Sequence, residues 1–385
     1  MTNKVLRGRR GKVMNGKSTH SEAKGGESAR NERNKTMPSP RLEVVTPSVD
    51  ANEYAELKRL IKRQGLLDKQ PAYYAYKILL TWGMLALSLS LVLLIDTLWL
   101  QLLNAVYLGF VFTQIAFIGH DLGHRQIFHS ARKSALLGLA VGNLTLGLSR
   151  GWWVDKHNQH HANPNHDELD PDIDFPILAF SEEQARSKWG FARFVLKYQA
   201  YLFFPLLLLE ALHMRIHSIN FLIQKKAKYL IAEVLLLIVH FALYFSLLFF
   251  LLGLLPALLF IVIHQAFFGL YLGSVFAPNH KGMPVLDKET KMDFLRRQVL
   301  TSRNLKAHSV TDFLFGPLGC QIEHHLFPTM SRNNQRKAEE IVKTFCRERS
   351  IAYHETSVLQ SYREILQHFH QVTAPLRTEE LSEVK

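Results

Sequence analysis

Long apolar runs alternate with polar stretches along this chain of 385 residues. Residues 78–95 and 98–119 carry no charged side chain, and a short turn at Asp96 separates them. A helix of roughly 20 apolar residues spans the hydrocarbon core of a bilayer. The two runs therefore predict two membrane crossings that are joined as a hairpin.

A second apolar block covers residues 229–276, which is about twice the length of one crossing. Gly253 and Pro256 offer a place for the chain to turn inside this block. The pattern predicts two further crossings, over residues 229–252 and 254–276, and hence a second hairpin.

The remaining segments are expected to form a soluble helical cap over residues 120–228 and 279–385. Two apolar segments in the first of these ranges, residues 135–148 and 198–209, are too short to cross a bilayer and should lie flat or be buried. The predicted fold class is an all-α integral membrane protein. Two transmembrane hairpins carry a cytosolic cap, and residues 51–385 form one domain.

The N-terminal residues 1–50 are expected to be a disordered basic tail, because the first forty contain almost no large apolar residues. A short amphipathic helix is predicted over residues 53–64, ahead of the first crossing. The net charge of +13 fits an anionic lipid surface, and no motif for nucleic acid stands out. Cys320 and Cys346 are too few to build a disulfide framework.

Basic residues predict the orientation of the hairpins. The turns at Asp96 and Gly253 contain no Lys or Arg, and short basic loops stay in the cytosol. Both termini and the whole cap are therefore expected to be cytosolic. The basic residues of the links on that side are Arg125, Arg132, Lys133, Arg150, Lys156, Lys225, Lys226 and Lys228.

Three histidine clusters lie beside apolar segments on this same side. Histidines that are three or four residues apart project from one face of a helix, as metal ligands require. Histidines without a common function would be expected on both sides of the membrane. The clusters are "HDLGH" with His120 and His124, "HNQHH" with His157, His160 and His161, and "QIEHH" with His324 and His325.

Membrane topology tests whether these clusters can meet, because the ligands of one site must share a face of the membrane. Residues 135–148 must then not cross, and an even number of crossings must separate the second cluster from the third. The block at residues 229–276 supplies two crossings, so residues 198–209 must not cross either. The short lengths of both segments agree with this requirement.

So many imidazoles exceed what one ion binds, since zinc typically takes four ligands. Two ions fit better, and iron, copper and zinc all accept imidazole. The carboxylates of Asp121 and Glu323 are expected to accept the second ring N–H of a ligand and to fix its tautomer. The acidic run Asp167, Asp170, Asp172 and Asp174 could do the same or could be a solvated loop.

The three clusters and their flanking text, "HHANPN", "DPDI" and "HHLFPTM", resemble the membrane fatty acid desaturases. The resemblance covers roughly residues 54–369. A third cluster that opens with Gln resembles the front-end and related acyl-lipid or acyl-CoA group. The chain contains no His-Pro-Gly-Gly motif of a fused cytochrome b5 domain. It is thus similar to bacterial members, which take electrons from a separate partner.

The resemblance implies a site for two non-haem iron ions that uses O2 to place a cis double bond in a long acyl chain linked to coenzyme A or lipid. It adds His280 of "APNHKG" to the ligands, with Asn279 holding a metal-bound water and Gln321 lining the site. The electron donor would be a ferredoxin, cytochrome b5 or NAD(P)H reductase. The implied location is the bacterial inner membrane. The implied ligands are His120, His124, His157, His160, His161, His280, His324 and His325.

Basic and aromatic residues near the second cluster suggest how such a substrate would be held. Arg150 and Lys156 could meet an anionic head group, or could simply be topology signals. Trp152 and Trp153 could line an acyl tunnel, although tryptophans are also common at the membrane interface.

Two other functions remain open on the sequence alone. A lipid hydroxylase would use the same oxidant but leave an oxygen atom on the carbon. A metal transporter would need ionisable residues along a path through the crossings, for which Glu233, His240 and His264 are the candidates.

Overall fold

A computed structural model describes residues 50–383 as a mainly helical protein. The expected tail over residues 1–50 lies outside the described residues, apart from Asp50, where α1 begins. The helices before the second apolar block are α1 (Asp50–Arg63), α2 (Pro71–Leu94), α3 (Leu98–Gly123), α4 (Ala131–Leu139), the π-helix η1 (Ala140–Leu146), α5 (Arg150–Ala162), α6 (Glu182–Ser187), α7 (Gly190–Lys197), α8 (Gln199–Leu207) and α9 (Glu210–Ile223).

The second half continues in helices, with one small sheet. Its strands, β1 (Asn304–Leu305) and β2 (Glu355–Thr356), pair in parallel. The helices are α10 (Leu230–Leu252), α11 (Leu254–His280), α12 (Phe294–Leu300), α13 (Ser309–Phe315), the 3₁₀ helix η2 (Gly316–Cys320), α14 (Gln321–Leu326), α15 (Arg332–Glu348), α16 (Val358–Val372) and α17 (Ala374–Glu383).

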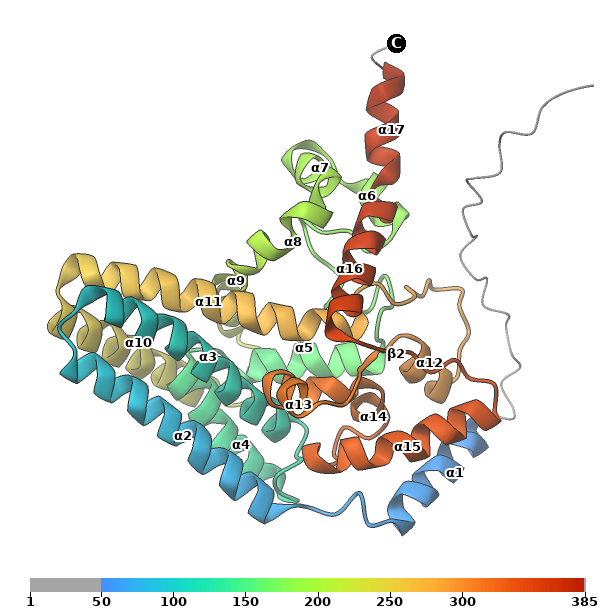
Figure 1. The fold of residues 1–385 in the computed structure, drawn as a ribbon, viewed down its shortest axis with the longest axis horizontal. Coiled ribbons are helices and arrows are strands. Elements are labelled where there is room, and N and C mark those ends of the chain that lie inside the picture. The colour runs from blue at the N-terminus through green and yellow to red at the C-terminus, as the bar shows by residue number, and fades with distance from the viewer. Residues whose placement is uncertain (1–49, 384–385) are drawn as a thin grey trace, which may run out of the picture. The chain divides into compact units, whose positions relative to one another are not determined.

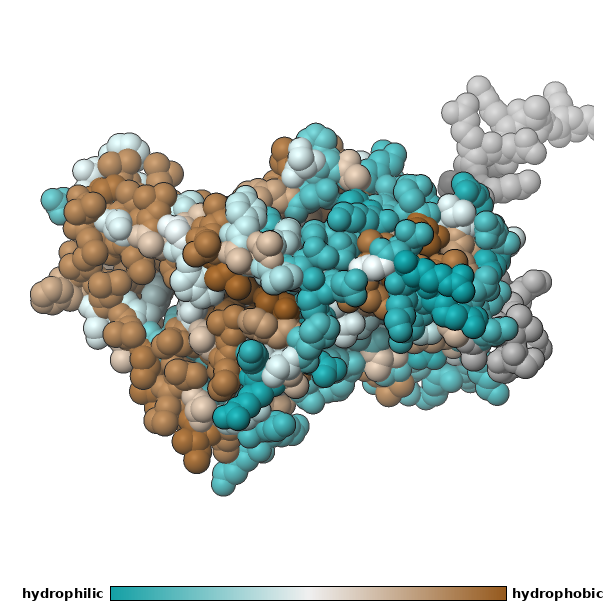
Figure 2. Space-filling view, turned by 90° about the horizontal axis from the view of Figure 1, so that it is seen from below, coloured by the Kyte–Doolittle hydropathy of each residue, from teal (hydrophilic) through white to brown (hydrophobic). Residues whose placement is uncertain are grey.

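Four helices in the described part of the chain, α2, α3, α10 and α11, are long and apolar enough to cross a membrane, which confirms the expected number. They lie together in Figure 1, with α3 packed against both α2 and α11. Their outer faces expose large apolar side chains, among them Leu94 at 79% and Phe250 at 88%. Figure 2 shows this apolar surface in brown at one end. Such a continuous patch suits contact with lipid.

Helix α2 begins at Pro71, seven residues before the expected start of the first crossing. Proline is well suited to the first turn of a helix, where its missing N–H is no loss. The charge-free run that predicts the first crossing starts after Lys77. The structure shows that Lys77 lies inside α2 and does not end the helix.

Helices α8 and α9 meet at a bend of 71°, and as a pair they also pass the length and composition test for a broken span or a re-entrant loop. Both helices pack against α11. The expectation that this region does not cross the membrane stays a prediction, as do the pairing of the long helices into membrane hairpins and the cytosolic side of the cap.

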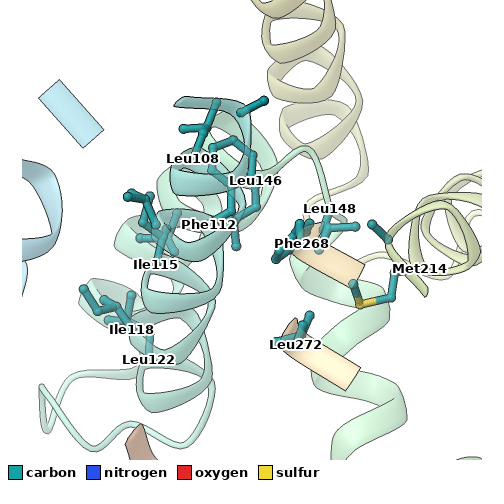
Figure 3. Packing of buried hydrophobic residues seen from close by; sticks show 14 of the residues in the cluster. Leu108, Phe112, Ile115, Ile118, Leu122, Leu146, Leu148, Met214, Phe268 and Leu272 are labelled. Carbon is teal, nitrogen blue, oxygen red and sulfur yellow. The ribbon is translucent and has the colours of Figure 1, made fainter. Parts of the chain in front are cut away.

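The core of the apolar part lies between α3 and α11. A Cβ atom on Gly109 of α3 would be 2.9 Å from the backbone nitrogen of Phe268 in α11, so only glycine allows this approach. Buried residues of α3, including Phe112 and Ile115, face Leu148 and Leu272 across the core (Figure 3). This packing fixes the ends of α3 and α11, where the candidate ligands His120 and His280 lie.

A second core joins helices of the polar part. Leu57 and Ile61 of α1 are fully buried in one cluster with Leu295 of α12 and Val342 of α15. Figure 1 shows α1, α12, α14 and α15 side by side at the end away from α10. This core supports α14, which carries the third histidine cluster.

Candidate metal centre

The first histidine cluster sits at the end of α3. His120 occupies the last turn of the helix and His124 is the residue after its end, and both are buried. Because they are four residues apart, their rings lie close, with centroids separated by 4.8 Å.

The second cluster lies in the last turns of α5. Ser149 caps the N-terminus of this helix, and its side chain accepts a hydrogen bond from the backbone N–H of Trp152. Glu233 of α10 is completely buried against the same end. Its carboxylate accepts hydrogen bonds from the Ser149 hydroxyl at 2.6 Å and the Gly151 backbone N–H at 3.1 Å. A carboxylate at a helix N-terminus also complements the helix dipole.

The remaining candidates come from α11 and α14. His280 is the last residue of α11, and His324 and His325 lie on the short helix α14. The side chains of all three are buried. Four segments that are far apart in the sequence therefore bring their histidines to one place.

The ring nitrogens form two groups. In each group, one nitrogen per residue lies within 4.8 Å of the others. The first group is His120, His124, His157 and His324. The second group is His160, His280 and His325. His161 borders both. Its Nε2 is 3.1 Å from Nε2 of both His157 and His324, and its ring stacks on His325 at 4.1 Å.

The second group shows why these nitrogens fit a cation. The Nδ1 atoms of His160, His280 and His325 each face an oxygen acceptor, at 2.9, 2.8 and 2.8 Å. In the neutral form of each ring the hydrogen is therefore on Nδ1, and Nε2 presents a lone pair.

These lone pairs converge. Nε2 of His280 is 3.2 Å from Nε2 of His160 and 3.0 Å from Nε2 of His325, with no hydrogen between them. Two nitrogens that each lie about 2.1 Å from one ion, at 90–109° to each other, are about 3.0–3.4 Å apart. The donor set and its spacing thus fit a metal ion bound by imidazole.

The acceptors at Nδ1 come from several elements. Both oxygens of Asp170 lie 2.9 Å from Nδ1 of His160. The carbonyl of Thr301 faces His280. Gln298 turns its amide oxygen to His325 because its amide nitrogen donates to the His161 carbonyl at 3.1 Å. Such contacts orient ligands and make them more basic.

Burial keeps most of these imidazoles neutral. Removal from water, reinforced by neighbouring histidines, holds the pKa of His124, His157, His161, His324 and His325 well below the usual value. Burial also acts on His160, but the carboxylates of Asp170 and Asp172 more than offset it and raise its pKa. Neutral imidazole is the form that binds metal.

Three of the four expected supporting residues lie at the site. Asp121 is 3.2 Å from Nδ1 of His120 and pairs with Arg332 on its other oxygen. Gln321 places its amide nitrogen 3.0 Å from Nε2 of His280. Asn279 is buried, and neither atom of its side-chain amide has a partner among the described residues.

Glu323 differs from the expectation that it would hold a ligand ring. Its carboxylate accepts hydrogen bonds from Asn304 at 2.7 Å and Tyr353 at 2.8 Å, and it faces β1 rather than a histidine. One residue before His324 on a helix, it points about 100° away from that ring. Burial raises the pKa of Glu323 to about 7.

The sequence missed the partners that α12 and α15 contribute. Gln298, Thr301 and Arg332 lie in segments without any ligand motif. Asp170 is one of four acidic residues in one loop, and the sequence does not indicate which of the four supports a ligand. Only the contact with His160 distinguishes it from Asp174, which is exposed.

A cavity of about 200 Å³ opens beside the first and second groups. Its polar end contains His120, His157, His160, His280, Asn279 and Gln321. Its apolar part includes Ala116, Leu146, Leu148, Met214 and Leu272, and both Trp152 and Trp153 line it. Lys156, Asp172, Glu210 and Lys281 also line it. Apolar, histidine and charged side chains therefore line one cavity.

The ionisable residues inside the long helices have other partners. Nδ1 of His240 is 2.9 Å from the carbonyl of Leu144, and Nδ1 of His264 is 2.7 Å from the hydroxyl of Tyr244. Glu233 holds the start of α5, as described above. These contacts account for the three residues as structural groups of the helix packing rather than as an ion path.

Comparisons with a family profile and with individual proteins point to the same family. The sequence profile described as "Fatty acid desaturase" matches residues 97–357. An "Acyl-lipid (9-3)-desaturase" of Physcomitrium patens is 30% identical over 84% of this chain and 63% of its own length. A "Delta(8)-fatty-acid desaturase" of Euglena gracilis is 29% identical over 83% of this chain and 79% of its own length. A "Delta(6)-fatty-acid desaturase fat-3" of Caenorhabditis elegans is 29% identical, over 78% and 70% respectively. The chain thus spans less than two thirds of the Physcomitrium patens protein.

Proposed function

This chain belongs to the fatty acid desaturase family, and we propose that it is an O2-dependent desaturase that introduces a cis double bond into a long acyl chain. Two adjacent methylenes each lose one hydrogen. Together with O2, two electrons and two protons, they yield one double bond and two waters. The names of the relatives support a fatty acyl substrate, and we propose that its acyl chain is linked to coenzyme A or to a lipid.

Two non-haem iron ions are the proposed cofactor. Bound iron with open positions supplies the reduction of O2 and the removal of hydrogen from unactivated methylenes. The observation that carries this assignment is the convergence of Nε2 lone pairs from His160, His280 and His325. The proposed ligands are His120, His124, His157, His160, His161, His280, His324 and His325.

The surrounding residues hold these ligands in place. Asp170, Thr301 and Gln298 each accept the Nδ1 hydrogen of a ligand and so keep its Nε2 directed at the site. Trp153 stacks on His157 with ring centroids 4.5 Å apart and covers the site from water. Asn279 and Gln321 offer amide groups beside His280 that can hold a water or O2.

The cavity fits the proposed substrate. Its apolar part can take methylenes, and burial of each methylene contributes about 0.8 kcal/mol. Lys156 and Lys281 also line the cavity, where both contact Asp172, and this charged group suits a polar head group. The reacting carbons would then lie beside His120 and His157, which line the same cavity.

The membrane arrangement that we propose follows from the basic loops. The four long helices span the bilayer and pair into two hairpins in chain order, and the histidine-bearing side and both termini face the cytosol. For a bacterial host this membrane is the inner one. Electrons reach the site from a separate donor protein.

A lipid profile of an expressing host tests the proposed activity. Wild-type chain should produce a new fatty acid that is two mass units lighter than its precursor. His160→Ala should abolish this product while the protein still accumulates in membranes. His129→Ala is the matched control, because His129 is exposed in a neighbouring loop, and it should keep full activity. A product heavier by one oxygen atom would instead identify a hydroxylase.

A further inference from the structure

A second pocket reaches the histidine site from another direction. It is open to solvent and shares no lining residue with the acyl cavity. At its inner end are His161 and His325, two of the proposed ligands, whose rings stack. Its wall includes Tyr54, Phe294 and Phe327. Substrate and a second reactant can thus approach the site by separate routes.

Helix α1 forms one side of this pocket and has an uneven charge distribution. Its two glutamates face neighbouring helices, where Glu53 pairs with Arg296 at 2.9 Å and Glu56 pairs with Arg349 at 2.8 Å. Four exposed cations, Lys58, Arg59, Lys62 and Arg63, recur at helical spacing on the outer face. Within residues 50–383, none of the four has an ion-pair or hydrogen-bond partner.

The basic residues continue to the mouth of the pocket. Lys58 lies one turn after Tyr54 and lines the pocket itself. Lys69 donates hydrogen bonds to the carbonyls of Arg125 at 2.7 Å and Thr329 at 2.9 Å, and Thr329 is also a lining residue. We call Lys58, Arg59, Lys62 and Arg63 the α1 basic face, and Lys69 lies after the end of α1.

We propose that the α1 basic face is the docking surface for an acidic one-electron carrier protein, which passes its electrons to the site through the His161–His325 end of the second pocket. This inference rests on the proposed function, whose reaction consumes two electrons for each double bond. Two reduced carriers bind in succession, and each is oxidised by one electron.

Charge complementarity favours a protein partner over a lipid surface. An interfacial helix binds a bilayer by burying its apolar face in it. The apolar face of α1 is already used, because Leu57 and Ile61 are fully buried against α12 and α15. Figure 2 shows mostly hydrophilic residues, with one small apolar patch among them, at the end of the molecule away from the large apolar surface.

The physics of such contacts also suits an electron carrier. Redox encounters are small and transient, and charge complementarity raises their association rate more than their affinity. Salt screens exposed charges, since the Debye length is about 10 Å at 0.1 M. Fast exchange of the carrier between the two electron deliveries requires this kind of weak, steered complex.

Binding of an acidic plant-type [2Fe–2S] ferredoxin tests the proposal without any metal in the site. The full chain in detergent should bind immobilised ferredoxin at low salt. Arg59→Glu/Lys62→Glu should raise the Kd about tenfold, and the difference should vanish at 0.5 M NaCl as screening shortens to about 4 Å. Lys306→Glu/Arg363→Glu makes the same charge change at exposed sites outside α1 and should leave the Kd within about twofold.

Carbodiimide cross-linking locates the contact directly. Peptide mass spectrometry should join ferredoxin carboxylates to Lys58 or Lys62. Cross-links that lie only outside the α1 basic face, or an unchanged Kd in Arg59→Glu/Lys62→Glu, would overturn the proposal. If the Kd of this variant is unchanged while its sedimentation with phosphatidylglycerol vesicles is lost, the α1 basic face binds the membrane and not the carrier protein.

A single turnover separates this proposal from the proposed function. Iron-loaded chain that is reduced by dithionite and then exposed to O2 needs no docking partner. Arg59→Glu/Lys62→Glu should form as much double bond as wild type in this assay, but less with ferredoxin. If wild type forms none after dithionite, the desaturase assignment fails, whereas the ferredoxin binding result stands on its own.

Discussion

The carboxylate of Glu233 in α10 accepts a 2.6 Å hydrogen bond from the hydroxyl of Ser149, the residue that caps the helix carrying the second histidine cluster. The same carboxylate accepts the Gly151 backbone N–H. An acidic side chain in an apolar helix therefore links α10 to the candidate metal centre, because it holds the start of α5.

Glu233→Ala should loosen this link. It leaves buried donors at Ser149 and Gly151 without an acceptor, at about 1–3 kcal/mol for each. We expect a lower apparent Tm, by about 5 °C or more, together with reduced iron content. Glu233→Gln keeps one oxygen acceptor and should be intermediate. Glu182→Gln, at an exposed position, is the control, and equal iron content in all four proteins would contradict the role of Glu233.

Asp170→Asn should weaken metal binding by the second group. Asp170 fixes the Nδ1 hydrogen of His160, and loss of such a contact typically lowers metal affinity about 10–100-fold. Titration of the metal-free protein with Fe²⁺ under anaerobic conditions measures this affinity. Asp174→Asn, in the same loop but exposed, should bind like wild type. An affinity in Asp170→Asn equal to that of Asp174→Asn would show that Asp170 does not orient the ligand.

Gly123→Ala should disturb the covering of the site. The added methyl would lie 2.2 Å from the Trp153 ring, which stacks on His157, so the indole must move. Product formation should fall by about tenfold or more, which corresponds to about 1.4 kcal/mol. In contrast, Gly83→Ala meets nothing within 4 Å and should be neutral or stabilise α2 by about 1 kcal/mol. Full activity of Gly123→Ala would show that the Trp153 position is not needed.

Ala116→Phe should block the acyl cavity and spare the metal. Ala116 lines the cavity one turn before His120, and a phenyl ring there would occupy the space for methylenes. We expect lost turnover of long acyl chains at unchanged iron content, measured on the same preparation. Ala86→Phe, on the exposed face of α2, is the control. Unchanged long-chain products from Ala116→Phe would place the substrate elsewhere.

The long helices and the histidine clusters could be predicted because both are local in the sequence. A long apolar run indicates a membrane-length helix, and a three- or four-residue spacing puts two rings on one face. The structure moves the start of α2 to Pro71, because a single lysine does not end an apolar helix.

The supporting residues could not be predicted, since they depend on tertiary contacts. Gln298 and Arg332 reach the site from α12 and α15, and the sequence around them contains no metal-binding motif. Glu323 is next to a proposed ligand in the sequence yet faces Asn304 and Tyr353, because neighbours on a helix point in different directions. The position of Glu233 in an apolar run suggests an ion path, whereas the structure shows its carboxylate bound to the hydroxyl of Ser149.

Metal analysis of the purified chain tests the central claim most directly. The two groups of imidazoles predict about two iron ions per chain, with nitrogen ligands at about 2.1 Å in X-ray absorption spectra. His280→Ala, which removes the centre of the second group, should lower the content to about one, while His129→Ala keeps two. Full occupancy by zinc alone, or an unchanged iron content in His280→Ala, would contradict a two-iron centre built from these histidines.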